Sequence, residues 1–104
     1  MADKKAESPG LVIYKYEFPD PDHGTEQTFR IPRGAKILSI QSQRYHLQIW
    51  ALVDRTKPEE DRTLVCYGTG RNIDRDSARL DHLATIQDET GLFVWHIFEV
   101  FTLI

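Results

Sequence analysis

The stretch HLQIWALVD, residues 46–54, is the most apolar segment of the chain, and its interior from Ile49 to Val53 has no polar face. Its length and β-branched residues favour an extended strand, with a helix as the competing interpretation. A strand that is apolar on both faces lies centrally in a sheet, covered on both sides or at a subunit contact. The segment LFVWHIFEV, residues 92–100, has the same character. Both segments are therefore expected to be covered on two faces.

Shorter strands surround these two segments, and strong turn signals separate them. Residues 11–18 (LVIYKYEF) and 25–31 alternate polar with apolar side chains, which is the period of a half-buried strand. The proline-rich turn at 19–24 indicates that these two strands form a hairpin. Further strands are predicted at 35–43, 62–69 and 80–87. With no amphipathic helical pattern, the chain is predicted to be all-β: an antiparallel β-sandwich or small barrel of about seven strands.

Length and composition fit one globular domain. The chain has 104 residues, of which 40% are apolar and 28% charged, enough for one core but not for two. Residues 1–10 have no hydrophobic segment after their lysines, so we expect a flexible polar arm rather than a signal peptide, followed by a single β domain at 11–104. The mostly apolar end, Val100–Ile104, is expected to complete the core or to add to a neighbouring subunit.

Charge and cysteine content narrow the function classes. The net charge of −3 argues against a general nucleic-acid binder, because neutralising phosphates requires a surplus of Lys and Arg. No apolar run approaches the roughly 20 residues of a membrane span. The single cysteine, Cys66, lies in an apolar strand, where its thiol is expected to be inert. A thiol without a disulfide partner fits a reducing cytosol.

No constellation of residues indicates catalysis. The serines lack the motif of an activated nucleophile. The carboxylates at 59–61 and 88–89 lie in polar turns, where they make poor acids at neutral pH. The four histidines form no HxH or HxxxH pair, although three of them could converge from different strands. We therefore expect no enzymatic activity, no cofactor and no metal site.

One segment has features of an anion site. Gly68-Thr69-Gly70 follows a strand, and glycines let backbone N–H groups approach a phosphate closely. Forked guanidinium groups also suit phosphate oxygens, and three arginines follow at Arg71, Arg75 and Arg79. The segment lacks the GxGxxG and GKS/GKT motifs. The alternative is a strand-end turn followed by a salt-bridged surface loop.

Trp50 and Trp95 stand apart from the other aromatic residues, because each alternates against an already apolar face. One of these faces is expected to pack against something outside the first core layer, unless a two-sheet core buries both. The outer contact could be a second subunit, a base-stacking ligand or a host protein.

Six motifs occur together and in order along the chain. They are KYEF (Lys15–Phe18), IPRGAKILSIQSQ (Ile31–Gln43), LQIWALVD (Leu47–Asp54), YGTG (Tyr67–Gly70), HLATIQ (His82–Gln87) and FVWHIFE (Phe93–Glu99). Together they resemble a family of small phage and prophage proteins, and the resemblance spans about Tyr14 to Glu99. The family offers no catalytic residue to transfer. The resemblance implies a phage-encoded protein that acts in the cytoplasm of a bacterial host.

The leading hypothesis is a homo-oligomeric phage counter-defence protein that sequesters a small anionic ligand, such as a cyclic nucleotide immune signal. In this hypothesis the three arginines supply charge, the glycines supply backbone donors, and Trp50 or Trp95 supplies a stacking surface. One alternative is a protein–protein inhibitor that docks its apolar face, or the acidic loop at 59–61, onto a host defence enzyme. Another alternative is a structural or morphogenetic protein of the virion.

Overall fold

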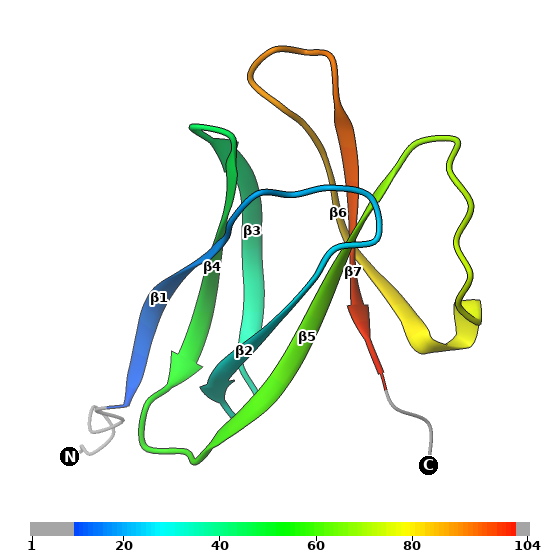
Figure 1. Ribbon diagram of the computed structural model, residues 1–104. Helices are drawn as coiled ribbons and strands as arrows, with labels where there is room; N and C mark the ends of the chain where they lie inside the picture. The colour runs from blue at the N-terminus through cyan, green and yellow to red at the C-terminus, as the bar shows by residue number, and fades with distance from the viewer. Residues whose placement is uncertain (1–9, 102–104) are drawn as a thin grey trace, which may run out of the picture.

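The computed structural model describes residues 10–101, which form an antiparallel β-sandwich of two sheets (Figure 1). One sheet has the strand order β1-β4-β3 and the other has the order β2-β5-β7-β6. The strands are β1 (Leu11–Phe18), β2 (Glu26–Pro32), β3 (Lys36–Gln43), β4 (His46–Asp54), β5 (Glu59–Gly68), β6 (Leu80–Gln87) and β7 (Val94–Val100). A short 3-10 helix, η2 (Ser77–Arg79), precedes β6. The predicted all-β architecture is confirmed.

The two apolar segments that predicted central strands, residues 46–54 and 92–100, both form interior strands. β4 lies between β1 and β3, and β7 lies between β5 and β6. The largest shift from a predicted boundary is at β5, which begins at Glu59 rather than Arg62. Its first residues pair with the end of β2, where Arg30 lies opposite Asp61. The predicted charged loop is shorter because these opposite charges extend the ladder.

The predicted hairpin of residues 11–18 with 25–31 is wrong. β1 pairs with β4, whereas β2 pairs with β5, so the two strands lie in different sheets. The connection between them crosses from one sheet to the other (Figure 1). Pro19 and Pro21 have no backbone N–H group, so this segment cannot continue a hairpin ladder.

The tight turn between β3 and β4 has an unusual conformation. Its two residues, Arg44 and Tyr45, have φ values of 54° and 66°. This left-handed region costs a residue other than glycine roughly 1–2 kcal/mol. A two-residue hairpin turn of this kind normally contains Asn-Gly. The fold therefore holds a tyrosine in a strained position at the tip of this hairpin.

The core lies between the inward faces of the two sheets. β4 supplies alternate residues to it, since Leu47, Ile49, Ala51 and Val53 are all buried. The facing sheet contributes Leu64, Cys66, Trp95 and Ile97. Each large aliphatic side chain buried in this way stabilises the fold by about 1.5–3 kcal/mol.

A buried ion pair lies among these apolar side chains. The Arg62 guanidinium on β5 donates two hydrogen bonds to the Glu99 carboxylate on β7, with N–O distances of 2.6 and 2.7 Å. A third guanidinium nitrogen donates to the carbonyl of Ala35, between β2 and β3. The hydrogen bond to Glu99 raises the pKa of Arg62. The pair therefore joins two neighbouring strands to the connection that crosses to the other sheet.

The chain ends add detail to the domain boundaries. Residues 1–9 of the predicted arm and 102–104 of the predicted tail lie outside the described residues. Gly10 already belongs to the domain, because its carbonyl accepts a hydrogen bond from the Arg55 N–H at 2.9 Å. A Cβ on Gly10 would lie 2.0 Å from Oδ1 of Asp54, so a larger residue at this position would have to displace the Asp54 carboxylate. Between residues 10 and 101, no helix is long and apolar enough to cross a membrane.

We predict that Glu99→Ala destabilises the domain by about 1.5–3 kcal/mol, because it removes two charge-assisted hydrogen bonds from the partly buried Arg62 guanidinium. The matched control is Asp61→Ala, which breaks the exposed pair with Arg30 and should cost less than about 1 kcal/mol. Urea unfolding followed by circular dichroism measures both values. Equal small losses for the two variants would contradict a structural role for the buried pair.

Candidate functional site

The Gly68-Thr69-Gly70 segment uses its own hydrogen-bonding groups internally. The Gly68 N–H donates to Nδ1 of His23 at 3.0 Å. The Thr69 hydroxyl hydrogen-bonds to Nε2 of His96 at 2.7 Å. Gly70 has a φ of 79°, which a turn at the end of β5 requires. The N–H group of Gly68 is therefore not available to an anion.

Among the three arginines at 71, 75 and 79, Arg75 is the most enclosed, and its charge is already compensated. Its guanidinium pairs with the Glu26 carboxylate and also donates to the Tyr67 hydroxyl at 3.2 Å. The hydrogen bond to Glu26 raises the pKa of Arg75. Arg71 is exposed, with its side chain packed beside Gly68. Of the predicted anion ligands, Arg71 retains the most freedom to meet a ligand.

The remaining predicted residues lie elsewhere. Arg79 is at the opposite end of the β2-β5-β7-β6 sheet from Gly68, since the residue that follows it, Leu80, pairs with Val100 at the end of β7. Trp50 lies on the outward side of β4, with the Lys15 ammonium 5.7 Å from its ring centre. Trp95 points inward from the other sheet. The eight predicted residues therefore do not form one site, because they come from both sheets and from opposite ends of one sheet.

The outward side of the β1-β4-β3 sheet carries a patch of exposed apolar side chains, which we call the apolar face. Its exposed members are Leu11, Ile13 and Leu38, and the half-buried side chains of Trp50 and Leu52 on β4 lie between them. Ile13 lies directly opposite Leu52 in the strand register. Leu38 joins them because a register shift between Ile37 and Ser39 places an extra residue there. Contiguous apolar patches on a monomer mark interaction surfaces.

Two lysines border this patch, one on each flanking strand. Lys15 on β1 lies opposite Trp50, and Lys36 on β3 lies opposite Leu52. The apolar centre of the face is thus placed between two ammonium groups. Such an arrangement suits a partner that presents apolar side chains bordered by carboxylates.

A polar hollow of about 540 Å³ adjoins the apolar face near the β3–β4 turn. Its basic lining residues are Lys15, Arg44 and His46. Gln48 lies at its base, largely buried, and donates a hydrogen bond to Oε2 of Glu17 at 3.2 Å. Its volume lies in the range of small-molecule sites, and its positive groups outnumber its single carboxylate. The hollow can hold a small anion.

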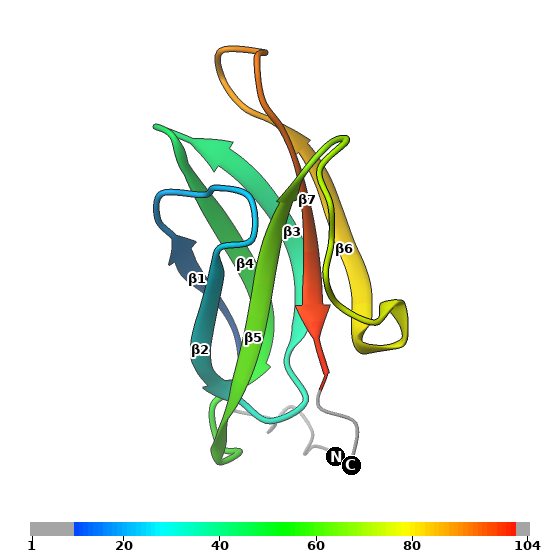
Figure 2. The ribbon, with the colours of Figure 1, turned by 45° about the vertical axis from the view of Figure 1, so that its right-hand side comes forward.

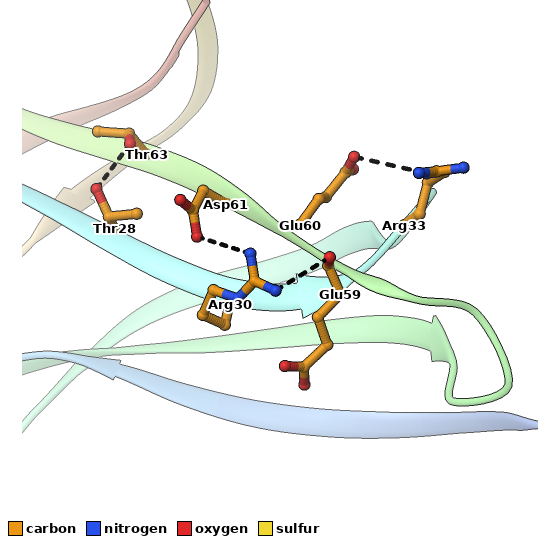
Figure 3. Close-up of polar contacts among 7 residues, drawn as sticks. All are labelled: Thr28, Arg30, Arg33, Glu59, Glu60, Asp61 and Thr63. Atoms are coloured by element: carbon orange, nitrogen blue, oxygen red, sulfur yellow. Dashed lines mark hydrogen bonds and ion pairs between the residues drawn. The ribbon is translucent and has the colours of Figure 1, made fainter.

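Two of the three carboxylates of the acidic segment at 59–61 are paired with arginines of β2 and of the turn that follows it (Figure 3). The Arg30 guanidinium pairs with Asp61 at 3.1 Å and donates to the Glu59 carbonyl at 3.2 Å. Arg33 lies 3.9 Å from the Glu60 carboxylate. These exposed pairs add little stability, but they remove most of the negative field that a basic partner would recognise.

Nucleophilic and metal chemistry find little support. Cys66 is completely buried, and this burial, with a smaller contribution from the Asp22 charge, raises the pKa of its thiol to about 12. His82 and His96 both hydrogen-bond to the Thr85 hydroxyl, at 2.9 and 3.0 Å. In the part of the chain that the structure describes, no group of three or more His, Cys, Asp or Glu could hold a metal ion.

Sequence reasoning missed the end of the sandwich where the β1–β2, β3–β4 and β6–β7 connections meet (Figures 1 and 2). Here the Glu89 carboxylate accepts hydrogen bonds from the Ser42 hydroxyl and from the Tyr45 N–H, the latter at 3.1 Å. It thereby joins two turns that are 44 residues apart in the chain. The available signal was Tyr45 itself, a bulky residue in a two-residue turn.

Comparison with known protein families gives one match. A family model described as "Domain of unknown function (DUF7352)" matches residues 10–102. The chain belongs to the DUF7352 family. The match to this DUF7352 protein begins at Gly10, which is also the first residue that the structure describes. No curated protein matches the chain, and no solved structure does so.

We predict that acid weakens the contact between the two turns of this DUF7352 domain. The hydrogen bond from Ser42, and secondarily that from the Tyr45 N–H, lower the pKa of Glu89 below its usual 4.5. The Glu89 carboxyl therefore binds its proton less tightly in the folded state than in the unfolded state. The Glu89 contribution is complete above pH 4.5 and disappears as the pH falls through the lowered value.

The measurement is urea unfolding of the wild type and Glu89→Gln between pH 3 and pH 7. The wild type should be more stable at neutral pH, and the difference between the two proteins should shrink toward pH 3. A difference independent of pH would show that the Glu89 charge does not contribute.

Proposed function

We propose that this DUF7352 protein is a non-catalytic binding protein that acts by docking another protein on its apolar face. The exposed patch around Trp50 and Leu52 supports this proposal most directly. The opposite side of β4 already fills the core, so the outward side chains are not needed to stabilise the domain. A tryptophan surrounded by aliphatic side chains is also the usual composition of an energetic centre in an interface.

The two lysines define the chemistry of the partner. Lys15 and Lys36 border the patch on either side, so a complementary surface carries apolar side chains flanked by Asp or Glu. A second copy of this chain would bring the same two lysines to the contact. This charge arrangement favours a different protein as the partner over self-association.

The resemblance to phage proteins suggests which proteins to test first. Small accessory phage proteins often block host defences, either by binding a defence protein or by sequestering a nucleotide signal. We therefore propose a counter-defence role in the host cytoplasm, in which the apolar face covers a functional surface of a host defence protein. The acidic segment at 59–61 is a weaker candidate for this contact, because Arg30 and Arg33 already compensate it.

We predict that Ile13→Glu abolishes docking by placing a carboxylate in the centre of the apolar face. The matched control is Ile73→Glu, because Ile73 is a comparably exposed isoleucine in the segment between β5 and η2. A partner captured on the wild type from host lysate is identified, purified and titrated against each variant by calorimetry. Ile13→Glu should weaken binding at least about 30-fold, equivalent to about 2 kcal/mol.

The control should bind the purified partner within twofold of the wild type, and both variants should melt within a few degrees of it. Equal loss in both variants would contradict docking on this face. Light scattering tests the alternative occupant. A wild-type dimer that Ile13→Glu converts to a monomer would show that the face joins two copies of the chain.

The basic hollow supports a second candidate function, the sequestration of a small anionic ligand such as a cyclic nucleotide. Lys15 and Arg44 supply permanent charge there, and Trp50 lies next to Lys15 as a stacking surface. In this version of the ligand hypothesis, Lys15 and Arg44 of the β1-β4-β3 sheet take the role that the sequence assigned to the arginines of residues 71–79. It retains the proposed chemistry, since cationic groups and an aromatic ring together suit a nucleotide.

We predict that a cyclic nucleotide raises the melting temperature of the wild type and that Lys15→Gln/Arg44→Asn removes the shift. Asparagine tolerates the positive φ of residue 44, so this variant should still fold. Arg71→Ala is the control and should keep the shift. If only Arg71→Ala lost the shift in melting temperature, the ligand would bind at the loop after β5 and not in the basic hollow. No shift with any nucleotide would end the ligand proposal.

A further inference from the structure

A separate cavity of about 230 Å³ opens at the end of the sandwich where three connections meet. Tyr45 comes from the β3–β4 turn, Phe93 and Trp95 come from the β6–β7 hairpin, and Asp22 lies in the β1–β2 connection. Asp88, at the other end of the β6–β7 turn, also lines the cavity. The cavity is therefore built by three segments that are distant in sequence.

The aromatic lining is unusually exposed for a small domain. Tyr45 is 64% exposed and Phe93 is 53% exposed, whereas Trp95 is buried beneath them. Phe93 and Trp95 stack in parallel, with ring centres 5.6 Å apart and ring planes 5° apart. This stack holds the Phe93 ring in a fixed orientation while one of its faces stays open to solvent. A rigid aromatic surface is thus available at the mouth of the cavity.

The conformation of the β3–β4 turn gives independent support. Tyr45 has a positive φ, in a turn that Asn-Gly would form with less strain. The Tyr45 ring contributes nothing to the core. Strain that the fold does not require is typical of functional positions. A role in binding explains why a tyrosine occupies this turn.

The charged residues of the cavity are acidic. Asp22 and Asp88 both line it, and no lysine or arginine does. The Thr90 hydroxyl, followed by backbone N–H groups of the turn, lowers the pKa of Asp88, so this carboxylate is ionised at neutral pH. The cavity therefore combines aromatic side chains with two carboxylates. Both features attract a cation.

We infer that this aromatic cavity binds an organic cation, either an alkylammonium or a guanidinium group. Its volume is below the 300–1,000 Å³ typical of sites for larger ligands, so it suits one such group rather than a nucleotide. The cation could be a free small molecule or the end of a basic side chain on a peptide. This inference does not rest on the apolar face, which lies on the outward side of the β1-β4-β3 sheet.

The test uses the fluorescence of Trp95. The chain has two tryptophans, so Trp50→Phe leaves Trp95 as the only one. Titration with tetramethylammonium chloride, with arginine amide and with the peptide acetyl-Gly-Arg-Gly-Arg-Gly-amide should give a saturable change in its emission. Sodium chloride at equal ionic strength is the control for salt effects.

Three variants in this background test the assignment. Phe93→Ala removes an aromatic wall, and Asp22→Asn removes a charge while keeping an acceptor for the His23 N–H. Each should weaken binding at least tenfold. The pair Arg44→Asn/Tyr45→Gly should also weaken binding tenfold, yet it should raise or maintain the melting temperature, because it relieves the turn. A merely structural role for Tyr45 would instead lower the melting temperature.

The outcomes separate the two sources of the cation. Saturation by tetramethylammonium or arginine amide identifies a site for free small molecules. Saturation by the peptide alone identifies a site for basic side chains of a partner. No saturable change with any of the three would overturn the inference. Unchanged affinity in Phe93→Ala and in the turn variant would overturn it as well.

Discussion

The sandwich depends on one buried polar interaction, the pair between Arg62 and Glu99. Burying either charge alone would be strongly unfavourable, so each is tolerated only with the other. The Ala35 carbonyl completes the arrangement, because it accepts from the guanidinium and lies between strands of different sheets. This interaction closes one end of the sandwich. The opposite end is formed by turns, and there the aromatic cavity opens.

The period of the hydrophobic pattern predicted the strands well, because alternation along residues such as 25–31 reports directly which face is buried. It could not predict which strands pair. The turn signals at 19–24 show that the chain changes direction, but not that β1 joins β4 while β2 joins β5. That choice is made by contacts between distant residues, above all those that place Phe18 and Ile31 in the same interior from opposite sheets.

The same limit explains the outcome for the candidate site. Glycines and arginines close in sequence indicated an anion site, but their partners come from far along the chain. His23 takes the Gly68 N–H and Glu26 takes the Arg75 charge, and neither contact can be read from the motif. The sequence singled out Trp50 and Trp95 alike, and only the structure shows that Trp95 belongs to the core while Trp50 lies on the outward side of β4. Tyr45 was not recognised, because a bulky residue in a two-residue turn is only a weak signal until its positive φ is known.

The start of β1 and the end of β7 lie toward the same end of the sandwich, away from the β6–β7 turn (Figure 1), and Gly10 lies beside the β4–β5 connection through its hydrogen bond with Arg55. Gly10 leads into β1 next to Asp54, and Phe101 follows the last residue of β7. A protein attached through its C-terminus to a sensor surface or a fusion partner would therefore present the cavity outward. Attachment through the N-terminus would bring the linker close to Leu11 and partly shield the apolar face. The location of the termini thus decides how the molecule must be oriented to expose both surfaces.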